Sequence, residues 1–241
     1  MIARAPQIGF DRFVQLDWVA GALAVRAGKR SLQELIAQLA DAGLGKEALV
    51  KTRTKLNALV LEPRPELADF VGRGAKLAAS DHVQEKVTPF AWGAALATYP
   101  YFAKIAEITG RLTSIQGDCL VAEVHRRVSE VYGDREITKR ATQAVLQTQA
   151  NWGAVTRVDR GKRLIRLDAK RLSDRQMVAW LVEAVLRHRG KALSVASLQS
   201  IPELYPFASD QPLAYLMSQS ELLELRMEGT SQQVVALKSE Q

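Results

Sequence analysis

The stretch that decides the fold is REITKRATQAVLQTQANWGAVTRVDRGKRLIRL, residues 135–167. Helical periodicity over 136–151 ends at Trp152-Gly153, and a glycine placed directly after the last periodic residue commonly terminates a helix. Two β-branched and apolar runs follow, 154–158 and 164–167, separated by the loop sequence DRGKR. Short runs of this kind around a glycine-containing loop are typical of a hairpin. The stretch therefore predicts a helix followed by a β-hairpin.

Positive charge is concentrated in the same part of the chain. Residues 135–171 hold ten Lys/Arg against three acidic residues, an excess of seven that equals the formal net charge of all 241 residues. The rest of the chain is therefore neutral as a whole. A localised basic surface attracts polyanions and raises their local concentration. Nucleic acid is the partner that this charge distribution indicates.

Two more helices are expected upstream of this stretch. The first covers about 100–110 and ends near Gly110. The second opens after Gly117 with Asp118 as its N-cap, and it places valines 121, 124, 128 and 131 on one face. A turn over 132–135 leads into the helix 136–151. The predicted order is helix, helix, turn, helix, hairpin.

This order resembles the winged helix-turn-helix class over about residues 100–168. The resemblance implies that helix 136–151 enters the major groove of DNA and that the wing, 154–167, contacts the backbone or the minor groove. Helical spacing places Lys139, Arg140, Gln143 and Gln147 on one outward stripe, opposite an inward face of Ile137, Ala141, Ala144, Val145, Thr148 and Trp152. The predicted DNA-binding residues are Arg135, Thr138, Lys139, Arg140, Gln143, Gln147, Arg157, Arg160, Lys162, Arg163 and Arg166.

The whole chain is expected to be mainly α. Residues 1–79 predict a helical N-terminal bundle, including a capping box at Ser31 and Glu34. Residues 80–99 are interpreted as a connector, 100–171 as the winged helix-turn-helix, and 172–241 as a second, winged-helix-like C-terminal module that repeats the plan more weakly. That last segment holds six basic and eight acidic residues, so protein contact or packing fits it better than DNA binding.

Two further features of the sequence have competing interpretations. Lys46, Lys51, Arg53 and Lys55 follow one predicted helix, either as an ordinary solvated face or as part of a further helix-turn-helix. The aromatic residues Trp92, Tyr99, Tyr101 and Phe102 predict a buried joint between modules, with base stacking as the second interpretation. The basic segment itself has one alternative role, a winged helix that binds proteins and serves as a scaffold in a complex.

The sequence favours a non-enzymatic protein without cofactors or metals. The three histidines, at 82, 125 and 188, have no neighbours at metal-ligand spacing, and no P-loop, GxGxxG or GxSxG pattern occurs. Asp159, Asp168 and Lys170 resemble the short D…DxK pattern of metal-dependent nucleases, a match with a high false-positive rate. Cys119 lies among apolar residues and is interpreted as part of the core.

The layout also resembles the BrxA family of small DNA-binding proteins from BREX phage-defence operons. The points of similarity are a basic, all-helical N-terminal half, a helix that ends in the Trp152-Gly153 pair before a short hairpin, and the modest chain length. This resemblance implies double-stranded DNA and other defence proteins as partners, with no intrinsic catalysis. A cytoplasmic location without a membrane span is expected, because no apolar stretch approaches the roughly 20 residues that a span needs.

Overall fold

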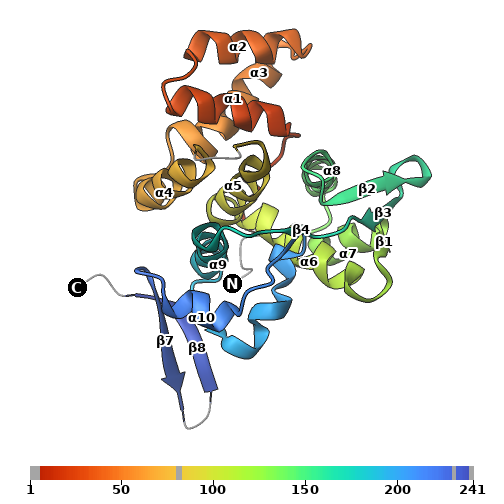
Figure 1. Ribbon diagram of the computed structural model, residues 1–241. Coiled ribbons are helices and arrows are strands. Elements are labelled where there is room, and N and C mark those ends of the chain that lie inside the picture. The colour runs from red at the N-terminus through yellow and green to blue at the C-terminus, as the bar shows by residue number, and fades with distance from the viewer. Residues whose placement is uncertain (1–5, 80–82, 230–231, 239–241) are drawn as a thin grey trace, which may run out of the picture.

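The computed structural model describes residues 6–79, 83–229 and 232–238 (Figure 1). Helices predominate, as the predicted fold class requires. The helices are α1 (Leu16–Arg26), α2 (Leu32–Asp41), α3 (Lys46–Leu56), α4 (Ala68–Ala79), α5 (Val83–Thr98), α6 (Pro100–Gln116), α7 (Val121–Tyr132), α8 (Glu136–Asn151), α9 (Arg175–Arg189) and α10 (Leu213–Ser218), with short turns η1 (Asn57–Leu61), η2 (Pro65–Leu67), η3 (Asp159–Gly161), η4 (Val195–Ser200) and η5 (Pro202–Leu204). The strands are β1 (Asp118–Leu120), β2 (Val155–Val158), β3 (Arg163–Arg166), β4 (Lys170–Arg171), β5 (Leu193–Ser194), β6 (Phe207–Ala208), β7 (Leu223–Glu228) and β8 (Gln232–Leu237).

Helix α5 lies at the centre of the molecule, between the N-terminal helices, α6 and α9 (Figure 1). Its side chains from Phe90 to Leu96 are buried. The interpretation of this region as a connector is therefore wrong for residues 83–98, while residues 80–82 lie outside the described part of the chain. Pro89 lies inside the helix. The prediction treated this proline as the end of an irregular segment, because proline is uncommon within helices.

The predicted buried aromatic joint is confirmed. Trp92 is fully buried, packs edge-to-face against Phe102 and Trp152, and donates from Nε1 to the carbonyl oxygen of Glu203 at 2.8 Å. Tyr99 and Tyr101 are buried as well. Because these rings are covered by protein, they are not available to stack on bases.

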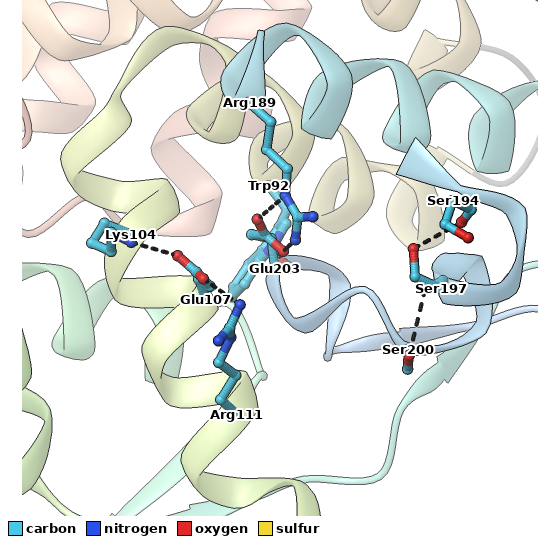
Figure 2. A network of polar contacts seen from close by, with 9 residues as sticks. All are labelled: Trp92, Lys104, Glu107, Arg111, Arg189, Ser194, Ser197, Ser200 and Glu203. Carbon is cyan, nitrogen blue, oxygen red and sulfur yellow. Dashed lines mark hydrogen bonds and ion pairs between the residues drawn. The ribbon is translucent and has the colours of Figure 1, made fainter. Parts of the chain in front are cut away.

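A second contact fixes the same joint. On α9, Arg189 donates to the buried carboxylate of Glu203, with nitrogen–oxygen distances of 2.7 and 2.6 Å, near the half-buried Lys104–Glu107 pair of α6 and its exposed partner Arg111 (Figure 2). Gly110 lets α6 approach the η5 turn, since a Cβ at that position would lie 2.1 Å from the carbonyl oxygen of Pro202. Gly110 is thus an interior contact residue. The helix expected to stop there continues to Gln116 and ends at Gly117, whose φ is +75°.

Helices α6, α7 and α8 accompany a three-stranded antiparallel sheet with the order β1-β3-β2, in which β1 lies between α6 and α7 along the chain and β2 and β3 follow α8. Asp118 lies in β1 rather than at the start of α7, so its predicted role as an N-cap is wrong. The N-cap of α7 is Leu120, which has no capping side chain. The carboxylate of Asp118 instead binds Arg163 of β3 at 2.6 Å.

The C-terminal region has the same order of elements as the central one. Helix α9, strand β5, turn η4 and helix α10 lead into the hairpin β7–β8, and the strand order β5-β8-β7 matches β1-β3-β2. Turn η5 and strand β6 are inserted before α10, and β6 pairs in parallel with β4, the strand that precedes α9. Buried side chains from Phe10 to Val235 form one continuous core, so the regions are packed together.

The N-terminal region adds helices α1–α4 and an extended segment, residues 6–15. The predicted capping box of α2 is confirmed: Ser31 and Glu34 bond each other's backbone amides. The extended segment, called the strap below, crosses to α8. There Val14 donates to Thr148 Oγ1 at 3.1 Å and accepts from Trp152 Nε1 at 2.9 Å.

Candidate nucleic-acid interface

Helix α8 is held against the core by one face, which decides what its other face presents. Ala141, Val145 and Thr148 are buried as predicted. Ile137, expected on the same face, is 53% exposed, because the inward position of the first turn is taken by its neighbour Thr138, which is in line with Ala141 and Thr142. Thr138 was predicted to contact DNA, but it is fully buried and its carbonyl oxygen accepts from Tyr101 Oη at 2.9 Å. Its side chain therefore does not reach the surface.

The outward stripe of α8 follows the prediction. Lys139, Arg140 and Gln147 are exposed, and Gln143 is half-buried. Arg140 forms an i,i+4 pair with Glu136 at 3.0 Å, while the side chain of Lys139 has no hydrogen-bond or ion-pair partner among residues 6–79, 83–229 and 232–238. The stripe thus carries one available cation, one paired cation and two amides.

The wing ends in a tight turn that directs two cations outward. Strands β2 and β3 pair from Val155–Arg166 to Val158–Arg163, and the turn between them has positive φ at Asp159 and Arg160. Positive φ is uncommon outside glycine. The side chains of Arg160 and Lys162 are exposed and have no polar partner in the described chain. They are the two most available charges of the wing.

Arg157 and Gln143 join the wing to α8. The Arg157 guanidinium donates to the amide oxygen of Gln143 at 2.8 Å and to the carbonyl oxygen of Gly161 at 3.4 Å. Both residues were predicted to contact DNA. Their contacts make them positioning residues first, since the bond between them sets where the wing tip stands relative to the helix.

The remaining predicted residues are engaged within the protein. Arg163 pairs with Asp118 at 2.6 Å and with Asp159 at 3.7 Å. Arg166 donates to the carbonyl oxygen of Tyr205 at 2.6 Å and stacks over its ring. Arg135, the N-cap residue of α8, donates to the carbonyl oxygen of Tyr132 at 3.0 Å. Of these three, Arg166 is the one directed into the core joint.

Two grooves flank the exposed stripe of α8. The wing groove, about 880 Å³, lies between α8, the wing and the start of α7, and contains Arg135, Arg157, Arg160 and Lys162. The strap groove, about 470 Å³, lies on the other side and is bounded by residues 11–13 and by Arg140 and Gln147. Glu136, Lys139 and Gln143 border both grooves. The stripe is therefore a ridge between two hollows. The sequence did not indicate the strap groove, because residues 11–13 are far from α8 along the chain.

The candidate metal-ligand and nucleophile positions can be placed in the structure. No group of three or more His, Cys, Asp or Glu side chains within them is arranged to hold a metal ion. Of the residues in the nuclease-like pattern, Asp159 pairs with Arg163 at 3.7 Å, and Lys170 donates to Thr88 and to the carbonyl oxygen of Trp152. Burial raises the pKa of the Cys119 thiol to about 11, which suits a core residue. His82 lies outside the described residues.

No family model, curated protein or solved structure matches the chain. Within the described residues, no helix combines the length and the apolar character that crossing a bilayer requires.

Proposed function

We propose that the chain binds double-stranded DNA through a winged helix-turn-helix formed by residues 100–166. The observation that carries the proposal is the ridge of α8 with a basic groove beside it, lined by the wing. The order of elements and the strand order β1-β3-β2 support it. A helix of this diameter fits the major groove, and unpaired Lys and Arg side chains displace counterions from phosphate.

The test uses the three cations whose side chains have no partner in the described structure. We expect the wild type to bind a fluorescein-labelled 30-base-pair duplex with an affinity that falls steeply between 50 and 200 mM NaCl, measured by fluorescence anisotropy. Replacing Lys139, Arg160 and Lys162 together by Gln should flatten the slope of log K against log salt by about 2 to 3, because each phosphate contact contributes about 0.9.

A matched variant distinguishes the effect of these three positions from the effect of a lower overall charge. Lys29, Lys46 and Arg53 are exposed, have no side-chain partner in the described residues, and lie in the N-terminal region. Replacing these three by Gln removes the same charge and should leave the slope near that of the wild type. The proposal is contradicted by an absence of binding at 50 mM NaCl, or by equal effects of the two triple variants. The second result would also support the alternative interpretation of the α3 charges.

The alternative function is a protein-interaction scaffold. One observation favours it: a groove of about 590 Å³ lies between α4, α9 and α10, with Tyr215 54% exposed and Leu222 39% exposed at its edge. Negligible DNA binding together with a stoichiometric complex after purification from the native cell would favour the scaffold. The resemblance to BrxA adds a proposal of its own, that the partners are other phage-defence proteins of the cytoplasm. Co-purification with the products of neighbouring genes tests that proposal.

A further inference from the structure

The strap places one arginine beside the ridge of α8, on the side away from the wing. Two buried residues fix the strap around it. Phe10 is fully buried and packs against Tyr99 and Phe102, with ring centroids 5.2 and 5.3 Å away. Val14 is fully buried and bonds α8 as described above. Arg12 lies between these anchors, so its backbone position is fixed by the core.

The side chain of Arg12 is not used by the fold. It has no hydrogen-bond or ion-pair partner among the described residues, although its neighbour Asp11 pairs with Lys55 at 2.9 Å. Arg12 lines the strap groove with Lys139 and Arg140. It also acts on α3, because it contributes, after Lys51, to lowering the pKa of Glu47. An available guanidinium therefore lines the strap groove beside α8.

The two acidic residues of the strap groove do not cancel this charge. Asp11 is engaged by Lys55 and Glu136 by Arg140. Arg12 and Lys139 are left as available cations on the strap side of the ridge, as Arg160 and Lys162 are on the wing side. The ridge thus has a positively charged wall on each side.

We infer that Arg12 is a DNA-binding residue that contacts the second phosphate strand when α8 lies in the major groove. A major groove is bounded by two sugar-phosphate strands about 12 Å apart, and a helix inserted between them has one strand on each side. The wing groove receives one strand and the strap groove the other. This inference rests on the proposed function and specifies its ligand. The ligand is B-form duplex, because the major groove of duplex RNA is too narrow and deep for a helix.

The experiment compares single variants by salt dependence on the same 30-base-pair duplex. Arg12→Gln should lower the slope of log K against log salt by about 0.9, and Arg12→Lys should restore it, because a phosphate contact needs charge rather than a particular side-chain shape. Lys29→Gln, an exposed charge elsewhere, is the control and should leave the slope unchanged. The slope is the readout because a partly unfolded sample changes the active concentration and not the slope.

Duplex RNA and single-stranded DNA of the same length complete the test. We expect the wild type to bind both at least tenfold more weakly than duplex DNA, with no effect of Arg12→Gln on either. The inference is overturned if Arg12→Gln behaves like Lys29→Gln while the Lys139, Arg160 and Lys162 triple variant still flattens the slope. It is also overturned if duplex RNA binds as tightly as duplex DNA. A wild type that binds no duplex DNA at 50 mM NaCl contradicts the proposed function itself.

Discussion

Removing the carboxylate of Glu203 should strongly destabilise the fold. Glu203 is 1% exposed, and both of its oxygens accept from Arg189, whose side chain is 22% exposed (Figure 2). Deleting one partner of a buried pair costs about 3–5 kcal/mol. Arg189 keeps some solvent contact and the nearby charge of Glu107, so the lower end applies to Glu203→Gln. We expect the free energy of unfolding to fall by about 3 kcal/mol, a decrease in Tm of roughly 6–12 °C for a chain of this size.

Urea denaturation followed by far-ultraviolet circular dichroism measures this loss. The control is Glu224→Gln, which removes one member of the exposed pair with Arg226 at 3.6 Å and should change the free energy by less than about 0.5 kcal/mol. Replacing both partners, Arg189→Met with Glu203→Leu, should recover most of the loss, because no unpaired buried charge remains. A decrease below about 1 kcal/mol for Glu203→Gln would refute the view that this pair secures the joint.

Three further predictions concern the same core. Burial lowers the pKa of His188. Its contribution to stability is therefore complete above the unfolded pKa of about 6.5 and is lost as the pH falls below that value. We expect His188→Gln to reduce the decline in unfolding free energy between pH 7 and pH 5, and an unchanged decline would contradict this. Because burial raises the pKa of Cys119 to about 11, the native thiol should react with Ellman's reagent at pH 8 at least tenfold more slowly than in 6 M guanidinium chloride; equal rates would show that it is accessible. Gly110→Ala should lower stability by about 1–3 kcal/mol by forcing α6 away from the carbonyl of Pro202, whereas a gain, as helix propensity alone would give, would show that the contact is loose.

Local signals were sufficient for most of the helices. The capping box at Ser31 and Glu34, the glycine after Trp152, and the inward Ala141 and Val145 depend on residues within one or two turns, and each was predicted correctly. The mainly helical class follows from such signals. The stripe of α8 was predictable for the same reason, since it is the side opposite the inward one.

Errors occurred where a distant residue decides the local role. Gly110 was predicted to end a helix, because glycine commonly does so. Its actual role is a close approach to Pro202, 92 positions later, which the local sequence does not indicate. Asp118 was predicted to cap a helix, because aspartate is common at that position. It instead pairs with Arg163, and that contact exists only once strand β3 lies beside β1. Arg166 and Gln143 were assigned to DNA, while their partners, Tyr205 and Arg157, come from packing of separate elements. The strap beside α8 left no periodic signal at all.

The strap also constrains the order in which contacts can form during folding. Val14 bonds Thr148, a partner 134 positions later, and closing so long a loop is slow because its entropy must be lost before any contact forms. During synthesis the strap emerges before α8 and can make this contact only after α8 has left the ribosome. The helices between them can pack earlier. Arg12 therefore cannot take its place beside α8 before α8 has been synthesised, and until then the ridge lacks one of its two positively charged walls.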